Sequence, residues 1–343
     1  MAEALNITDT SWSGPAASYM ITRAVVGADT IEKGCIYVED GIRKTKSIPR
    51  VEVSNFIQKR TATPTSAGSV DVDRRALTPL DLMLYYEFNP RDYEVHYYAE
   101  QLQPKLLGRE LPVTAENFMM MQTMKRLNEF FENAIWRSRL QFDPSSASYV
   151  TPTSKGDANA GAYFYFDGLI KKALDANTGA FPTKVVSSPL PLVATASVGG
   201  TSENIAEALL RIYKLVPQAL LFKYGEGGLK FHMSYSTQQT WEEYITTTTT
   251  FKNNDTTERG INRYKGYEIK PLAGMPDNTI IACISKPDID SNLWLGINST
   301  EDNQLQLQRL QNNSELFFVK GLFKMDTQIG FADQLVIYTT LTA

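Results

Sequence analysis

Residues 114–142 read TAENFMMMQTMKRLNEFFENAIWRSRLQF, with Pro112 and Pro144 just outside the stretch and no Gly or Pro inside it. Apolar side chains recur in steps of three and four residues, the spacing of one helix face: Met120, Met124, Leu127, Phe131 and Ala134. Much of the remaining surface is polar, with Lys125, Asn128, Glu129, Glu132, Asn133 and Arg139. At 1.5 Å per residue this helix is about 40 Å long, and it exceeds the usual helix of about 11–12 residues. The sequence therefore predicts one long amphipathic helix against which other elements pack.

The composition is that of an ordinary globular protein. Of 343 residues, 21% are charged and 43% hydrophobic, and the net charge is −4. This charge does not favour tight nucleic-acid binding, and no run of about 20 apolar residues is present that could span a membrane. The N-terminus lacks the features of a signal peptide. The two cysteines, Cys35 and Cys283, are far apart, which favours a reducing compartment without structural disulfides.

Residues 1–34 are rich in Ala, Ser, Thr and Gly and follow no sustained period. Trp12, Tyr19, Met20 and Ile21 are the conspicuous apolar residues in this segment. A segment with so few apolar side chains cannot form a core of its own. We therefore predict an extended arm, with Trp12 as a candidate contact with another subunit.

Residues 35–77 predict a two-stranded finger, because alternating stretches flank the turn-forming sequence TATPTSAGS. An isolated hairpin is marginal in water, so the finger should lie on another surface. It carries eight basic side chains against five acidic ones, a net charge of +3, which favours an acidic partner. Its candidate contact residues are Arg43, Lys44, Lys46, Lys59, Arg60, Arg74 and Arg75.

The block that follows the long helix predicts a compact α+β unit. A helix is expected over 202–216 with Ser202 as its cap, and another after a capping box at 236–239. Strands are expected over 229–233, 267–272 and 279–285, the last two joined by a turn at 275–278.

The tail predicts two paired strands that pack on the long helix. Phe317, Val319, Phe323 and Met325 alternate with Lys320, Lys324 and Asp326, and a second strand is expected over 335–339.

No set of residues resembles an active site. The two histidines, His96 and His232, do not have the spacing of metal ligands, and Gly225–Gly228 lacks the lysine of a phosphate-binding loop. No acidic pair stands out as an acid–base couple. We therefore expect no enzymatic activity, no metal and no cofactor.

The order of these parts resembles the major capsid protein of tailed double-stranded DNA phages, the Hong Kong 97 type. The resemblance is carried by FDGLI at 166–170, GYEIKPLAGMPDNTIIACI at 266–284 and FFVKGLFKMDTQIGFADQLVIY at 317–338. It implies an α+β fold with an N-terminal arm (1–34) and an extended β-hairpin finger, or E-loop (35–77). It also implies a peripheral domain (78–144 and 305–343) that contains the spine helix 114–142, and an axial domain (145–304).

The resemblance implies a viral structural protein. Its subunits would self-assemble into hexamers and pentamers of an icosahedral capsid shell around the phage genome. Implied partners are other copies, portal and scaffold or decoration proteins of the same virus, and packaged DNA contacted non-specifically. The expected location is the virion capsid, assembled in the host bacterial cytoplasm. The arm starts almost at Met1, which suggests a separate scaffold protein or none. Lys44, Lys46 and Lys59 match no cross-linking motif.

Three alternatives remain open at this point. The first is an encapsulin-type nanocompartment that encloses a cargo enzyme within the same fold. The second is another virion structural protein, such as a tail or decoration component. The third is an enzyme with an unfamiliar site, which a deep pocket with converging ionisable groups would favour.

Overall fold

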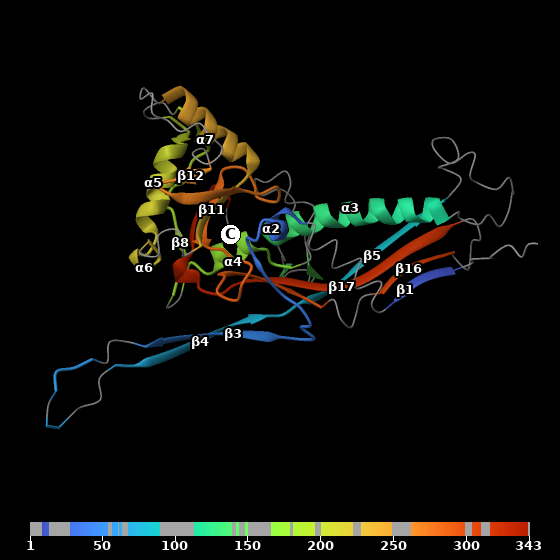
Figure 1. Cartoon of the computed structure of the whole chain (residues 1–343), viewed down its shortest axis with the longest axis horizontal. Coiled ribbons are helices and arrows are strands. Elements are labelled where there is room, and N and C mark those ends of the chain that lie inside the picture. The colour runs from blue at the N-terminus through green and yellow to red at the C-terminus, as the bar shows by residue number, and fades with distance from the viewer. Residues whose placement is uncertain are drawn as a thin grey trace, which may run out of the picture.

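The computed structural model describes most of the chain between Asp9 and Leu341. The described residues are 9–13, 28–53, 57–60, 62–63, 68–89, 113–138, 142–143, 148–149, 166–178, 181–195, 200–221, 228–248, 262–298, 304–309 and 316–341. They form two six-stranded sheets, several helices and a projecting hairpin (Figure 1).

Sheet 1 is built around β17 (Phe317–Ile329), a strand of 13 residues. Along its first part β17 pairs with β16 (Gln304–Arg309) on one side and β5 (Leu80–Phe88) on the other. Its last part pairs with β15 (Leu293–Ile297), which in turn pairs with β2 (Tyr37–Glu39). The outer position beside β16 is taken by β1 (Asp9–Ser13).

The long helix α3 (Val113–Arg137) packs on sheet 1, as its apolar face predicts. The ring of Phe131 meets Phe323 of β17 edge to face, with 5.3 Å between centroids. Alternate residues of β17 are buried beneath the helix because successive side chains of a strand point to opposite faces. The helix ends at Arg137, five residues before the predicted end. Just beyond the helix, the Ser138 carbonyl accepts a hydrogen bond from Gly168 N–H at 2.7 Å. The backbone at Ser138 is therefore bonded to the residue that precedes Leu169.

Sheet 2 has the order β12 (Arg263–Tyr264), β13 (Tyr267–Pro271), β11 (Leu229–Met233), β14 (Thr279–Ile284), β18 (Val336–Thr339) and β8 (Lys184–Val185). Strand β14 is buried on both faces. Ile281 and Cys283 join the core shared with α3 and sheet 1, whereas Ile280 and Ala282 join a second core. That second core contains the buried face of α5 (Ile205–Leu215).

The remaining elements are short, apart from α7 (Tyr235–Thr248). The helices and helical turns are α2 (Asp29–Glu32), α4 (Leu169–Asp175), α6 (Gln218–Leu221) and η3 (Ala332–Gln334). The short strand pairs are β6 (Phe142–Asp143) with β7 (Ser148–Tyr149), and β9 (Leu192–Val193) with β10 (Glu203–Asn204).

Two predicted helix caps are wrong. Helix α5 is capped by Asn204, whose side chain accepts from Ala206 N–H at 2.8 Å. Ser202 cannot serve because Glu203 and Asn204 are extended and pair with β9. Helix α7 begins at Tyr235, and the hydroxyl of Ser234 accepts from Thr237 N–H, so the cap lies two residues before the predicted Ser236.

The predicted tail pairing is also wrong. Strand β18 does not pair with β17; it lies in sheet 2 between β14 and β8. Asp326 was expected on the polar side of its strand, yet it is only 6% exposed. Its carboxylate accepts from Lys172 of α4 at 2.7 Å and from Thr78 N–H at 2.9 Å, and these donors compensate its burial.

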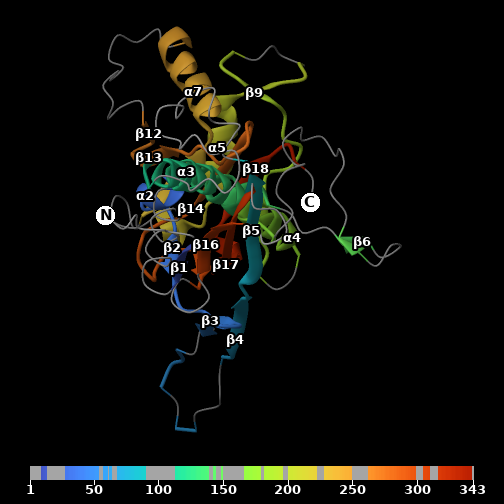
Figure 2. The ribbon, with the colours of Figure 1, turned by 90° about the vertical axis from the view of Figure 1, so that its right-hand side faces the viewer.

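The finger is the hairpin of β3 (Lys46–Val53) and β4 (Val70–Leu77), which are antiparallel and paired from Lys46–Leu77 to Val53–Val70. The finger projects away from both sheets. Strand β5 begins at the base of the finger and extends from there to the other side, toward the body (Figures 1 and 2). Residues 35–39, which the prediction included in the finger, lie in the body instead, with Cys35 and Ile36 buried and β2 paired to β15. No helix in the described part of the chain is long and apolar enough to cross a membrane.

Candidate functional site

The outward face of the finger is apolar and exposed. Val70 and Val72 are 63% and 69% exposed, and their directly paired residues on β3 are Val53 and Val51. A two-stranded ribbon has no third layer that could cover these valines. The finger therefore carries an apolar surface that its own subunit leaves in solvent.

The base of the finger is tied firmly to the body. Ile48 and Leu77 are 5% and 0% exposed. The guanidinium of Arg50 donates to both carboxylate oxygens of Asp333, at 2.6 and 3.1 Å, and lies 3.9 Å from the ring centroid of Phe181. Gln328 donates to the Ala76 carbonyl at 2.6 Å. The sequence does not predict the contact between Arg50 and Asp333. Nothing in a basic hairpin distinguishes an arginine that binds the body of the same subunit from the other cations.

The predicted contact residues divide into two groups. Five of them are exposed: Arg43, Lys44, Lys59, Arg60 and Arg74. Lys46 and Arg75 are partly buried, and Lys46 forms an ion pair with Glu39 of its own subunit. Trp12 lies in β1, where it is paired with Leu305 of β16 in the same chain. The structure does not bring these residues together into one cluster, and whether they contact another subunit stays a prediction.

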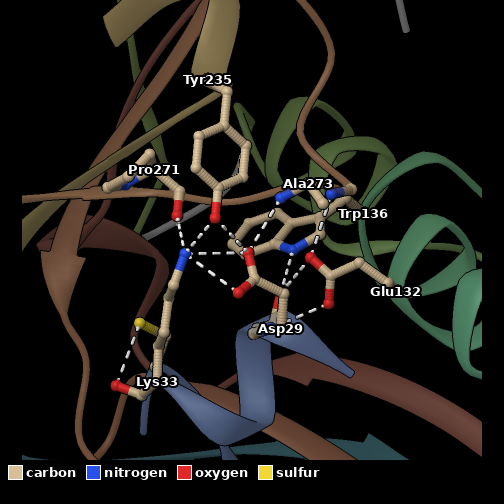
Figure 3. A network of polar contacts seen from close by, with 10 residues as sticks. Asp29, Lys33, Glu132, Trp136, Tyr235, Pro271 and Ala273 are labelled. Atoms are coloured by element: carbon tan, nitrogen blue, oxygen red, sulfur yellow. Dashed lines mark hydrogen bonds and ion pairs between the residues drawn. The ribbon is translucent and has the colours of Figure 1, made fainter. Parts of the chain in front are cut away.

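A buried polar network holds residues 28–33, the last part of the predicted arm, inside the body (Figure 3). Glu132 of α3 is only 4% exposed and accepts three hydrogen bonds. They come from the Thr30 N–H (2.8 Å), the Thr30 hydroxyl (2.8 Å) and the Gly274 N–H (3.0 Å). The Thr30 hydroxyl also accepts from the indole of Trp136 at 2.7 Å. This end of the arm is therefore part of the fold.

The outer side of the same network joins α2 to sheet 2. The Lys33 ammonium donates to Asp29 (3.0 Å), the Tyr235 hydroxyl (2.6 Å) and the Pro271 carbonyl (2.6 Å) (Figure 3). Asp29 in turn accepts from Ala273 N–H at 3.1 Å. Helix α2 thus connects α3, which packs on sheet 1, to the chain at the end of β13 in sheet 2.

Burial raises the pKa of Glu132, and the hydrogen bonds from Thr30 and Gly274 act in the opposite direction. Burial likewise raises the pKa of Asp326, against the effect of Lys172 and the Thr78 N–H. Both carboxylates have fixed donors and contact no open surface, so we assign them to holding the fold and not to proton transfer.

The cysteine thiols and the possible metal ligands lie in surroundings that do not favour catalysis or metal binding. Cys35 and Cys283 are free and buried, and burial raises the pKa of both thiols, so neither is an activated nucleophile. Within the described ranges no group of His, Cys, Asp and Glu side chains could hold a metal ion. His96 and residues 225–227 lie outside the described residues, and Gly228 adopts a φ of +72° at the start of β11.

His232 is fully buried in β11 beside Trp136, with ring centroids 6.0 Å apart. Neither ring nitrogen has a hydrogen-bond partner among the residues that the structure describes. Burial, together with Lys230 and Lys270, lowers the pKa of His232 to about 3. An unpaired buried polar group costs about 1–3 kcal/mol, so His232 is a cost to stability.

Replacing His232 with leucine is therefore expected to raise the free energy of unfolding at pH 7. Between pH 6.5 and 3 the unfolded chain binds a proton that the folded chain does not bind. Wild-type stability should fall by up to about 1.4 kcal/mol per pH unit as the pH decreases through this window. Urea unfolding at pH 7 and pH 5 measures this, and the advantage of the leucine variant should be larger at pH 5. An equal difference at both pH values would contradict the assignment of a neutral, unpaired imidazole.

Comparisons with known proteins place the fold. No family model matches the chain, and no curated protein matches its sequence. The capsid of a native GTA particle is 13% identical with a TM-score of 0.56, over 92% of this chain and 91% of that one. A chain of the satellite phage P4 procapsid, which includes the size determination protein, is 8% identical with a TM-score of 0.53, over 95% and 99%. The capsid of Myoviridae phage XM1 is 11% identical with a TM-score of 0.52, over 92% of both chains.

These neighbours are capsid proteins of phages and of the GTA particle, and this chain has their mixed α+β fold over nearly its full length. The fold predicted from the order of elements is confirmed at that level. With identities of 8–13%, the similarity concerns the fold alone.

Proposed function

We propose that this chain is the major capsid protein of a tailed phage, a structural subunit that assembles with copies of itself into a closed shell. The observation that carries the proposal is the finger. Its valine face is left in solvent by its own subunit, while its base is fixed to the body. Such a device gains stability only when another copy covers it. The fold shared with capsid proteins supports the same conclusion, and it favours a structural role over an enzymatic one.

The parts of the chain are then assigned as follows. Residues 1–34 are the arm, of which 28–34 are built into the body, and 35–77 contain the finger. Residues 78–144 and 305–343 form the peripheral domain with its spine helix, and 145–304 form the axial domain. Strand β18 crosses this division because it pairs with β14. Arg43, Lys44, Lys59, Arg60 and Arg74 are exposed cations that we assign to contacts with neighbouring subunits.

Assembly into hexamers and pentamers follows from contacts between unlike surfaces of identical subunits, which close into rings. Portal, scaffold or decoration proteins of the same virus and non-specifically held DNA complete the proposed partners. The proposed location is the virion capsid, after assembly in the host cytoplasm. A net charge of −4 suits a container whose DNA must leave again, since a strongly basic lining would retain it.

The proposal is tested by expressing the chain alone and together with the proteins encoded beside it in its genome, and by examining the purified material. We expect closed particles in electron micrographs, and sedimentation in the megadalton range. DNA inside the particles supports the phage capsid, whereas a packaged enzyme would indicate a nanocompartment. A folded chain that remains monomeric under every such condition would overturn the proposal.

A further inference from the structure

Two connections lead directly from a strand of one sheet to a strand of the other. Residues 285–292 join β14 of sheet 2 to β15 of sheet 1. Residues 330–335, which contain η3, join β17 of sheet 1 to β18 of sheet 2. The angle between the two sheets therefore depends on how these connections are held.

The two connections are joined to each other by one residue, Asn292, which is only 1% exposed. Its side-chain amide donates to the Phe331 carbonyl at 2.8 Å and accepts from the Phe331 N–H at 2.5 Å. Its backbone carbonyl accepts from Gly330 N–H at 2.9 Å, and its N–H donates to the Ile284 carbonyl at 3.0 Å. Because all four partners are backbone groups, these hydrogen bonds fix the separation of the two connections.

The finger is attached to the second connection through Arg50. Its guanidinium donates to both carboxylate oxygens of Asp333 and lies 5.7 Å from the ring centroid of Phe331. The same group lies 3.9 Å from the ring centroid of Phe181, in the chain that leads into β8 of sheet 2. A bidentate pair between a guanidinium and a carboxylate fixes orientation as well as distance. Arg50 thus holds the finger against the border of sheet 2.

Other ties of the finger lead to sheet 1. The Lys46 ammonium pairs with Glu39 of β2, and the Thr78 N–H donates to Asp326 of β17 at 2.9 Å. The base of the finger therefore contacts both sheets. A change in the angle between the sheets would move these contacts relative to that of Arg50, so the finger could keep all of them only by turning.

We propose that the finger and the connection 330–335 form one conformational unit, in which Arg50 couples the direction of the finger to the angle between the two sheets. Asn292 belongs to this unit because it binds the same connection at Phe331. Coupling between two sites is reciprocal, so a contact that fixes the finger also fixes the angle, and a change at the connection alters the finger. The coupling is a property of the single subunit, so its test does not depend on assembly.

Hydrogen exchange of the folded chain tests the coupling from the side of the finger. Arg50→Met keeps an unbranched side chain and removes the ion pair with Asp333. The readout is the pair of amides at Lys184 and Val186, which donate to carbonyls within 335–337. We expect both to exchange about tenfold faster, which corresponds to a loss of about 1.4 kcal/mol in the free energy of local opening.

Lys46→Met is the matched control for this variant. It removes a cation from the same strand, but the partner of Lys46 is Glu39 in sheet 1. Exchange at Lys184 and Val186 should therefore stay at the wild-type rate. Unchanged exchange at these two amides in Arg50→Met, or an equal increase in Lys46→Met, would overturn the proposal.

The opposite direction is tested at Asn292. Asn292→Ala should raise exchange in residues 46–50 of the finger about tenfold, whereas Ser285→Ala should not. Ser285 lies in the same connection and is equally buried, but its hydroxyl donates to the Cys35 carbonyl at 2.7 Å. Wild-type exchange over 46–50 in a folded Asn292→Ala chain would contradict the coupling, and if this variant does not fold, the result for Arg50→Met decides alone.

Discussion

A subunit in which the whole segment of residues 51–72 is replaced by the dipeptide Asn-Gly is expected to fold like the intact chain and to form no particles. Arg50 and Asp73 face each other in the hairpin register, so a two-residue turn can connect them without moving the base. The removed residues include Val70 and Val72, which are exposed in the subunit, whereas Ile48, Arg50 and Leu77 are retained. The body therefore loses little buried surface, but a shell would lose the contact that we propose for the finger.

Two measurements separate the effects of this deletion. Thermal unfolding of the shortened subunit should occur within a few degrees of the intact one, and electron microscopy should show no shells under conditions where the intact chain assembles. The matched control replaces only residues 61–67, in the sequence between β3 and β4, with a Gly–Ser linker of equal length, which keeps Val70 and Val72. Normal shells from the shortened subunit would show that the finger is not an assembly element.

Gly274→Ala is expected to destabilise the subunit by ~3 kcal/mol or more, near the upper end for overpacking. A Cβ at this position would lie 2.1 Å from the carbonyl oxygen of Glu132 and 2.9 Å from Cδ1 of Trp136. The first of these atoms belongs to the backbone of α3 and cannot rotate away. The segment around Gly274 would have to move, and it would lose its hydrogen bonds to Glu132 and from Arg137.

Gly330→Ala is the matched control for this substitution. Gly330 is also buried, but the nearest atom to its added Cβ is Nε1 of Trp294 at 3.4 Å, an ordinary contact. Denaturant unfolding of both variants should give a large loss for Gly274→Ala and a change below about 1 kcal/mol for Gly330→Ala. Equal stability of the two variants would mean that the turn at 272–275 does not touch the helix as described.

The elements that the sequence predicts well are those whose signal is local. The apolar face of α3 and the alternation along β17 each require only the order of residues within one segment. The strand predicted over 279–285 agrees with β14 to within one residue, because its apolar run ends at a turn on one side. Local patterns of this kind determine which residues are buried, but they do not specify the partner.

What the sequence could not supply are the long-range partners. Glu132 was assigned to the polar face of its helix, yet it is buried because Thr30 and Gly274, 102 and 142 residues away, donate to it. The sequence of strand β18, VIYT, predicts a strand equally well whether it pairs with β17 or with β14. Arg50 resembles the other cations of the finger, and only the position of Asp333, 283 residues further along, separates it from them.

The ties at the base of the finger have a mechanical consequence. Arg50 to Asp333, Thr78 to Asp326 and Gln328 to Ala76 connect both strands of the hairpin to β17 and η3. A load applied at the tip is therefore transmitted into the central strand of sheet 1 and not absorbed by a loose joint. If copies of this chain must fit rings of different curvature, the bending has to occur beyond Val51 and Val72, where the ribbon stands clear of the body.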